Sequence, residues 1–382
     1  MTTPCVLVLN AGSSSIKAAL IAVHHGSDGV SEQRLWHGQR TWQGPPAGGS
    51  AVELQLTIDG CLDGWLIEAI EPWLAALCLV GHRVVHGGER FQQATCIDAG
   101  VRQAIAEAAA LAPLHNALAL AVINWVEAWL IPRRPGLRQW ACFDTAFHSS
   151  IDEIHFSYAI PAAWRARGLR RYGFHGINHQ HIADTVTAIH REEGCSDSTL
   201  NQLRLVSAHL GAGCSLCAIA GGRSMGTTMG MTPLDGLVMA SRSGSIDPGL
   251  LLHLLDEGLT PAELGDALNH RSGLVGLSGL STDMRELRRA AAEGHSGAEL
   301  AIAVFTERLL EGIAAMVAVL RGVDVIAVSG GIGENDQQLL HTMQRELSWL
   351  GSFRLLQVPA NEEGHIARQC LEAQAPGPGS AG

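Results

Sequence analysis

Positive charge is scarce in this sequence, and the scarcity excludes several classes of partner. Lysine and arginine together number 26, against 37 aspartate and glutamate residues, which gives a formal net charge of -11 at pH 7. Nucleic acid and anionic membrane surfaces repel a chain of that charge, so neither is expected as its main partner. An enzyme of anionic substrates would therefore have to concentrate its positive charge locally.

The sequence lacks the signals of four further features: a disulfide scaffold, a redox or zinc site, a signal sequence and a transmembrane helix. The nine cysteines are an odd number without regular spacing, which favours reduced thiols in a cytoplasm over a secreted disulfide scaffold. Cys214 and Cys217 form a C-x-x-C without a second pair of metal type, so we expect buried thiols rather than a redox or zinc site. No basic region precedes the short apolar run at the N-terminus, and Asn124 and Glu127 interrupt the longest apolar stretch, 117–131. Neither a signal sequence nor a transmembrane helix is expected.

The sequence does have a polar turn between two apolar strands near its start. Residues 6–9 are apolar, Gly12 and three serines form the turn, and Lys17 lies at the start of a second apolar segment, 16–23. Backbone amides, hydroxyls and an ammonium group can together hold a polyphosphate. The spacing is not that of a P-loop, and an ordinary serine-rich hairpin explains this segment equally well on its own.

A second copy of the pattern favours the phosphate-binding interpretation. Residues 205–219 again give a strand, a glycine-rich turn and a strand, about halfway along the chain. A chain of 382 residues exceeds the usual size of a single core. Two similar hairpins in such a chain indicate duplicated domains that face each other across a cleft.

Hydrophobic periodicity predicts further elements. Alternation over 52–58 predicts a half-exposed strand beside the first hairpin. Residues 101–111 and 116–130 are expected to be helical, and an apolar stripe predicts a long helix over 302–320.

The last part of the chain repeats a strand and a glycine-rich segment. We expect a buried strand over 323–328, a glycine-rich turn over 329–335 and a helix from about Asp336. Such a junction suits nucleotide phosphates, although tight turns also need glycine. The tail, 373–382, is of low complexity and is expected to be disordered.

Taken together, these segments resemble the acetate kinase family, within the superfamily of sugar kinases, heat-shock chaperone ATPases and actin. The resemblance extends from Asn10 to about Ala367. The segments that carry it are 10–17, 82–88, 111–116, 143–148, 171–176, 242–248, 283–285, 330–335 and 361–363. It implies an α/β fold of two duplicated actin-like (ribonuclease H-like) domains. The first comprises 1–148, with the C-terminal segment 363–382 packing back on it, and the second, 149–362, binds the nucleotide.

The resemblance also implies an activity, the reversible transfer of the ATP γ-phosphate to acetate. A carboxylate acceptor is already ionised, so no general base is needed, and the barrier lies in bringing an anion onto a polyanion. Positive charge and alignment must then do most of the work. Taken singly, an arginine is more often a surface or ion-pair residue, an aspartate a helix cap and a histidine a core residue. The resemblance instead implies catalytic roles for Arg83, Asp144, His175 and Arg242.

The remaining site residues follow from the resemblance alone. It implies a Mg²⁺ site, or alternatively a Mn²⁺ site, at Asn10 and Glu362, and a supporting role for His115. Acyl binding is assigned to Arg83, Val85, Leu114, Phe174 and Pro233, whose small apolar pocket disfavours butyrate. Nucleotide binding is assigned to Lys17, His209, Leu210, Gly211, Ala212, Gly213, Asp283, Met284, Arg285, Gly331, Ile332, Gly333, Glu334 and Asn335.

Two positions depart from the family pattern and leave alternatives open. Ala212 stands where the family usually has asparagine, and Gly226 where it commonly has aspartate. The alternatives are a propionate kinase, a kinase with another phosphate donor and, in a different class, a nucleotide-binding sensor or chaperone-like ATPase. The intact set of catalytic residues argues against the last. A cytoplasmic homodimer is what the resemblance implies for location and assembly.

Overall fold

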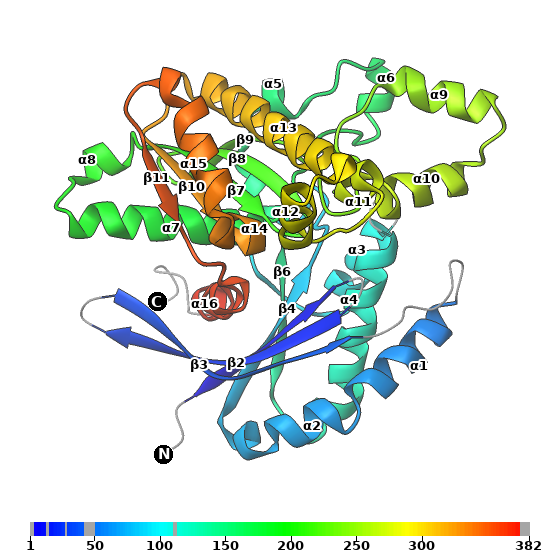
Figure 1. Cartoon of the computed structure of the whole chain (residues 1–382). Coiled ribbons are helices and arrows are strands. Elements are labelled where there is room, and N and C mark those ends of the chain that lie inside the picture. Colours follow the sequence, from blue (N-terminus) through cyan, green and yellow to red (C-terminus); the bar gives the residue numbers. More distant parts are fainter. Residues whose placement is uncertain (1–3, 13–14, 27–28, 42–49, 110–112, 375–382) are drawn as a thin grey trace. The chain divides into compact units, whose positions relative to one another are not determined.

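The computed structural model describes residues 4–12, 15–26, 29–41, 50–109 and 113–374. The chain divides into two compact units, one of residues 1–146 with 361–382 and the other of residues 147–360 (Figure 1). The role that the sequence assigns to each unit stays a prediction.

The first unit is built on a six-stranded sheet with the order β3-β2-β1-β4-β6-β5. The pairs β1–β2, β2–β3 and β5–β6 are antiparallel, whereas β1–β4 and β4–β6 are parallel. Its strands are β1 (Cys5–Ala11), β2 (Ser15–Gly26), β3 (Gly29–Thr41), β4 (Leu77–Val84), β5 (Thr95–Cys96) and β6 (Arg138–Phe143). Its helices are α1 (Ala51–Leu62), α2 (Trp65–Ile70), η1 (Glu71–Ala76), α3 (Ala99–Ala108), α4 (Pro113–Trp125), η2 (Val126–Leu130) and α16 (Glu362–Gln374).

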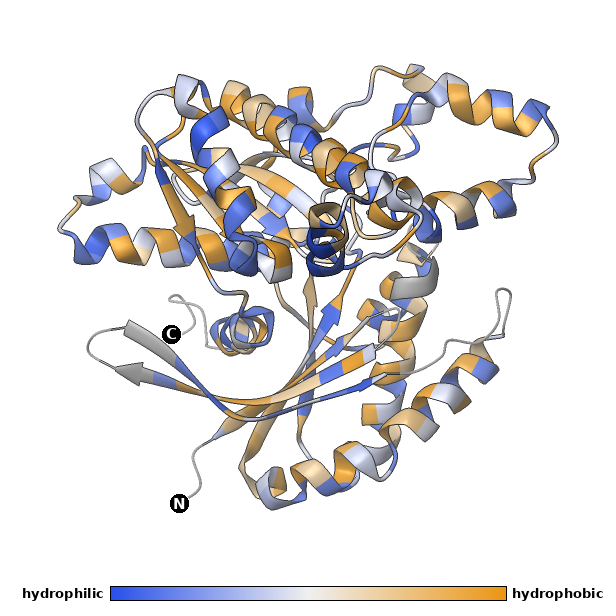
Figure 2. Ribbon diagram, viewed as in Figure 1, coloured by the Kyte–Doolittle hydropathy of each residue, from blue (hydrophilic) through white to orange (hydrophobic). Residues whose placement is uncertain are grey.

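Helices cover both faces of this sheet. On one face, Leu7 and Leu9 of β1 share a buried cluster with Trp125 of α4. On the other face lies α16, which packs on β1, β2 and β4. A Cβ at Gly81 would lie 2.8 Å from Ile366 Cγ2, so glycine in β4 lets α16 approach the sheet. Figure 2 shows that α16 itself carries both hydrophobic and hydrophilic residues, as expected of a helix with one buried face.

The strand expected over 52–58 is wrong, because these residues lie in α1. Ser50 accepts a hydrogen bond from Glu53 N while the Glu53 carboxylate accepts from Ser50 N, a capping box that starts the helix. Of the alternating apolar residues only Ile58 is fully buried, whereas Val52 is 69% exposed. The third strand of the sheet is β3, which the apolar pattern did not indicate.

The second unit contains a five-stranded sheet with the order β11-β10-β7-β8-β9. Its strands are β7 (Arg204–Leu210), β8 (Cys214–Ala220), β9 (Arg223–Thr227), β10 (Val325–Ser329) and β11 (Arg354–Gln357). Its longer helices are α7 (Gly176–Glu192), α9 (Pro248–Asp256), α10 (Pro261–His270), α12 (Met284–Ala292), α13 (Ser296–Leu320) and α15 (Gln337–Glu346). Its short ones are η3 (Ala146–Ser150, which begins in the first unit), α5 (Glu153–Phe156), α6 (Ala162–Arg165), α8 (Asp197–Leu200), α11 (Gly273–Ser278), α14 (Gly330–Asn335) and η4 (Ser348–Leu350).

The two sheets repeat one topology, which confirms the predicted duplication. In each, an antiparallel meander (β1-β2-β3 or β7-β8-β9) has two parallel strands beside its first strand, β4 and β6 or β10 and β11. Both hairpins are present, as β1-β2 and β7-β8, and the helices expected over 116–130 and 302–320 are present as α4 with η2 and as α13. The helix expected over 101–111 is α3, which ends at Ala108, and residues 110 and 111 lie outside the described ranges.

The glycine-rich segment 329–335 differs from the expected turn. Residues Gly330–Asn335 form the short helix α14, which Asp336 separates from α15. Gly330 has φ 84°, and a Cβ there would lie 2.8 Å from the carbonyl oxygen of Leu210, so only glycine lets β10 turn directly into a helix at this point.

Cys214 and Cys217 are buried in β8, and burial raises the pKa of both thiols to about 12. Across the described ranges, no cluster of three or more His, Cys, Asp or Glu side chains is placed to hold a metal ion. The helices in those ranges are all too short or too polar to cross a membrane. The tail beyond Gln374 lies outside them.

Candidate active site

Four polar side chains of the first unit gather at one edge of its sheet. Asn10 lies near the carboxyl end of β1, Arg83 near that of β4, and Asp144 directly after β6. Because these neighbouring strands are parallel, their carboxyl ends meet at the same edge. Glu362, the first residue of α16, completes the cluster.

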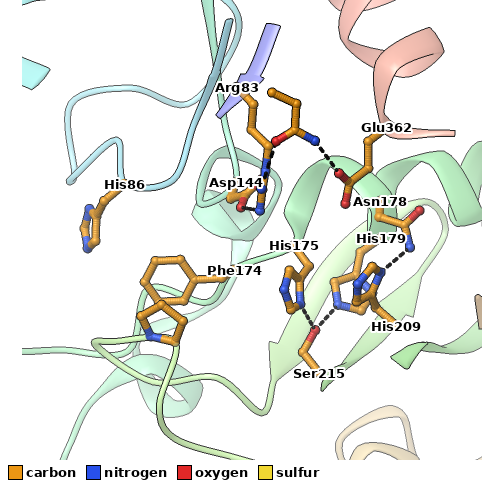
Figure 3. Close-up of polar contacts among 12 residues, drawn as sticks. Arg83, His86, Asp144, Phe174, His175, Asn178, His179, His209, Ser215 and Glu362 are labelled. Carbon is orange, nitrogen blue, oxygen red and sulfur yellow. Dashed lines mark hydrogen bonds and ion pairs between the residues drawn. The ribbon is translucent and has the colours of Figure 1, made fainter. Parts of the chain in front are cut away.

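Hydrogen bonds link the four residues into one chain. Arg83 Nε donates to Asp144 Oδ1 at 3.0 Å and Nη2 to Oδ2 at 2.5 Å, a bidentate ion pair. Arg83 Nη1 donates to Asn10 Oδ1 at 3.1 Å, and Asn10 Nδ2 donates to Glu362 Oε2 at 3.1 Å. Figure 3 shows Arg83 with Asp144 and Glu362. A planar guanidinium fixed on two sides is presented in one orientation.

Burial makes this ion pair important for the fold as well. The Asp144 side chain is 2% exposed and that of Arg83 16%. Burial raises the pKa of the Asp144 carboxyl, and the guanidinium opposes that shift. Burial also disfavours the charge on Arg83, but Asp144 and Glu362 outweigh it and raise the pKa of the guanidinium. Each of the two buried charged groups is therefore stabilised by the other, and the loss of either would leave an unpaired buried charge.

The assignment of a metal to Asn10 and Glu362 stays a prediction, which the chemistry of their side chains allows once a metal replaces Arg83 Nη1 at Asn10 Oδ1. Their linked side chains place an amide oxygen and a carboxylate in one cluster, and oxygen is the ligand class that Mg²⁺ prefers. Two protein ligands leave the other coordination positions to water and phosphate, which is the usual arrangement around Mg²⁺ in phosphoryl-transfer sites.

The other assigned residues of the first unit lie around this edge or outside the described side chains. Lys17, the only lysine of the sequence, is exposed on β2 and pairs in register with Asn10. Val85 is buried just after β4. Leu114 and His115 belong to α4, but their side chains lie outside the part of the chain that the structure describes.

In the second unit, His175 is held at the start of α7. It is the N-cap residue, with a left-handed φ of 56° that is uncommon outside glycine and stores local backbone strain. Its Nδ1 lies 2.9 Å from Ser215 Oγ, and its ring lies 4.3 Å, centroid to centroid, from that of His209. Phe174, the residue before it, is fully buried.

Side-chain nitrogen atoms of His175 and Arg242 both lie close to Gly213. A Cβ at Gly213 would lie 3.2 Å from His175 Nε2 and 3.6 Å from Arg242 Nη1. Arg242 Nη1 also donates to the carbonyl oxygen of Pro233 at 3.2 Å. An imidazole and a guanidinium therefore present nitrogen atoms beside the same glycine, an arrangement that suits a phosphoryl group.

We expect Gly213→Ala to lower kcat by on the order of tenfold while leaving the fold intact, because the added methyl group displaces the His175 ring by a few tenths of an ångström and only touches Arg242 Nη1. Steady-state kinetics and circular dichroism measure the two effects. Gly265→Ala, where an added Cβ would meet nothing within 4 Å, is the matched control. Wild-type kcat in Gly213→Ala would show that the reacting group does not lie beside Gly213.

A pocket of about 790 Å³ in the second unit contains most of the assigned nucleotide residues. The assigned residues that line it are Gly211, Ala212, Asp283, Met284, Arg285, Gly331, Ile332 and Asn335. Three separate segments of the sequence thus meet around one cavity large enough for a nucleotide.

The other assigned nucleotide residues do not line this pocket. They are Lys17, His209, Leu210, Gly213, Gly333 and Glu334. The Glu334 carboxylate accepts hydrogen bonds from Gly330 N and Ala360 N, both at 2.9 Å, so it ties the start of α14 to the end of the second unit.

Sequence reasoning missed several polar residues of the second unit. Arg288 and Asp336 line the pocket and form an ion pair at 2.9 Å. Ser215 and His179 form hydrogen bonds in the surroundings of His175. For His179 a signal was available, because it follows His175 by four residues and a helix brings such residues onto one face.

Comparisons with known proteins agree over almost the whole chain. A model of the acetokinase family matches residues 5–365. An acetate kinase from Synechococcus sp. is 42% identical over 365 residues, which span 91% of this chain and 88% of that protein. The acetate kinase of Deinococcus radiodurans is 42% identical over 90% of this chain and 86% of its own. Among solved structures, a propionate kinase from Francisella tularensis has a TM-score of 0.80 at 32% identity, covering 96% of this chain and 99% of its own. An acetate kinase from Porphyromonas gingivalis has a TM-score of 0.77 at 30% identity, covering 97% and 99%.

Proposed function

Because this chain belongs to the acetokinase family, we propose that it is an acetate kinase, which reversibly transfers the γ-phosphate of ATP to acetate. The products are acetyl phosphate and ADP. The observation that carries the proposal is the linked cluster of Glu362, Asn10, Arg83 and Asp144, in which a buried carboxylate fixes a guanidinium beside an amide and a second carboxylate.

The proposed mechanism is a direct in-line transfer without a covalent enzyme intermediate. An acetate oxygen attacks the γ-phosphorus, the bond from phosphorus to the bridging oxygen of ADP breaks, and that oxygen keeps the electron pair. No proton has to be removed from acetate. The protein's contribution is to align two anions and to neutralise their charge.

Each catalytic side chain has a proposed part in this step. Arg83 grips the acetate carboxylate with the orientation that Asp144 gives it. His175 and Arg242 donate hydrogen bonds to the oxygens of the transferred phosphoryl group. Asn10 and Glu362 would hold Mg²⁺, or alternatively Mn²⁺, which supplies positive charge to the phosphate oxygens when bound.

We propose that the nucleotide binds in the 790 Å³ pocket, and a substitution at Ala212 tests which phosphate donor the enzyme uses. Ala212 is exposed and lines the pocket, so an asparagine side chain has room there. Ala212→Asn is expected to lower KM for ATP about fivefold, the effect of one added hydrogen bond of ~1 kcal/mol, with little change in KM for acetate. Steady-state kinetics with ATP, GTP and pyrophosphate as donors measure this. A higher KM for ATP in the variant would contradict the missing-contact idea, and a native preference for pyrophosphate would replace ATP as the donor.

A propionate kinase is the second candidate, because the Francisella tularensis structure to which this chain is similar carries that name. The family resemblance assigns the acyl group to Val85, Leu114, Phe174 and Pro233, and one methylene changes specificity only modestly. A hydroxamate assay with acetate, propionate and butyrate decides between the two. A higher kcat/KM for acetate supports the proposal, and a higher value for propionate favours the alternative.

The proposal includes a cytoplasmic homodimer. Leu250, Leu252 and Leu255 of α9 are exposed, and apolar side chains of this kind are what a dimer interface buries. Light scattering of the purified protein tests the assembly, and a monomer at working concentration would contradict it.

A further inference from the structure

A chain of buried hydrogen bonds runs inward from His175 through the second unit. His175 Nδ1 lies 2.9 Å from Ser215 Oγ, which lies 2.7 Å from His179 Nε2. His179 Nδ1 in turn lies 2.8 Å from Ser207 Oγ. Ser207, Ser215 and His179 have no exposed surface. Figure 3 shows the part of this chain from His175 through Ser215 to His179.

Each hydroxyl and each neutral imidazole has one proton to donate, so the hydrogen bonds in this series can all point in either of two directions. In the outward direction Ser207 donates to His179 Nδ1, His179 Nε2–H donates to Ser215, and Ser215 donates to His175 Nδ1. In the inward direction every hydrogen bond is reversed, and His175 Nδ1–H donates to Ser215. Burial, followed by the neighbouring His148 and His209, lowers the pKa of His179 well below its usual value, so this ring carries a single proton in either direction.

The hydrogen-bond partners of the Ser207 hydroxyl determine which of the two directions is favoured. Within the described ranges, His179 is the one hydrogen-bond partner of the Ser207 hydroxyl. In the outward direction that hydroxyl donates its hydrogen to His179. In the inward direction it only accepts, and its own hydrogen is left buried without an acceptor, which is unfavourable. In the outward direction the Ser207 hydroxyl, His179 Nε2–H and the Ser215 hydroxyl each donate to an acceptor.

We propose that Ser215, His179 and Ser207 are positioning residues that hold His175 as the tautomer protonated on Nε2. The catalytic part of this inference rests on the proposed function, in which His175 donates a hydrogen bond to the transferred phosphoryl group. With Nδ1 accepting from Ser215, the donor must be Nε2, the atom that lies toward Gly213. In the inward direction a neutral His175 would carry its proton on Nδ1 and could not donate from Nε2.

The first test is a set of serine variants. Ser215→Ala is expected to lower kcat about tenfold with little change in either KM, because it removes the group that orients His175. Ser207→Ala lies two hydrogen bonds farther away and is expected to lower kcat by about twofold to tenfold, the range that one hydrogen bond controls. Ser207→Thr keeps the hydroxyl and should restore kcat.

Ser224→Ala is the matched control. Ser224 is equally buried, and its Oγ lies 2.9 Å from His148 Nδ1, so its loss also removes a hydroxyl beside a buried imidazole. Ser224 does not belong to the series of hydrogen bonds that leads to His175. Its kcat is expected to stay at the wild-type value. Equal losses of kcat in Ser207→Ala and Ser224→Ala would indicate a general packing effect and overturn the proposal.

The second test needs no activity and therefore separates this inference from the proposed function. Nitrogen-15 NMR of the imidazole rings reports which nitrogen carries the proton. His175 and His179 are both expected to be protonated on Nε2 in the wild type, with a fraction of His179 protonated on Nδ1 in Ser207→Ala. A wild-type His179 protonated on Nδ1 would overturn the proposal, even in an active acetate kinase. The expected tautomers in a protein that forms no acetyl phosphate would support it and contradict the proposed function instead.

Discussion

Replacing Arg83 with alanine is expected to remove most turnover and to destabilise the fold at the same time. The guanidinium is proposed to hold the acetate, and the loss of one such charged donor lowers kcat by about 10²- to 10³-fold, or ~2.7 to 4 kcal/mol. The same substitution leaves the buried Asp144 carboxylate without its ion-pair partner, which costs about 3–5 kcal/mol of folding free energy. Kinetics and urea unfolding measure the two losses.

A second substitution separates the two roles of Arg83. In the double variant Arg83→Ala with Asp144→Asn, no buried charge is left unpaired, so part of the stability should return. Turnover should stay low, because no guanidinium is present. A folded Arg83→Ala variant with more than about a tenth of the wild-type kcat, a loss under ~1.4 kcal/mol, would remove Arg83 from the catalytic residues.

Arg242→Leu is expected to lower kcat as strongly, by about 10²- to 10³-fold. Arg242 Nη1 donates to the Pro233 carbonyl oxygen at 3.2 Å and lies 3.9 Å from Met239 Sδ. Its charge is needed chiefly in the transition state, so KM should change much less than kcat.

Arg242→Lys is the control for this prediction. It keeps the charge but not the planar fork, so its kcat should lie between those of the wild type and Arg242→Leu. If Arg242→Leu kept its turnover, the assignment of Arg242 to the phosphoryl group would be wrong.

The sequence predicts the first two strands of each meander and β10, but it misses β4 in the middle of the first sheet and the edge strand β3. The hairpins β1-β2 and β7-β8 are apolar on both sides of a glycine turn, so local pattern and buried environment agree. Residues 52–58 alternate as a strand does, but the capping box of Ser50 and Glu53 and the burial of Ile58 and Leu62 make them helical. β3 is a polar edge strand, and the Asp28-Gly29 dipeptide, a favoured hairpin turn, was the signal available for it.

The site residues also divide into those that short sequence motifs reveal and those that depend on contacts between distant segments. A resemblance in short motifs was enough to select residues that gather in the structure, such as Arg83 with Asp144 and Asp283 with Gly331. It could not reveal the hydrogen bonds from Ser215 and Ser207 to two histidines, because these contacts join β7, β8 and α7 across 28 to 40 residues of sequence. Hydroxyls of this kind carry no motif of their own.

The most direct test of the central claim is phosphorus-31 NMR of the purified protein with ATP, Mg²⁺ and acetate. We expect the acetyl phosphate signal to grow in step with that of ADP, and inorganic phosphate to stay at the level of a control without enzyme. ADP that forms together with inorganic phosphate, with no acetyl phosphate, would contradict the claim and indicate instead an ATPase that uses its nucleotide for a conformational change.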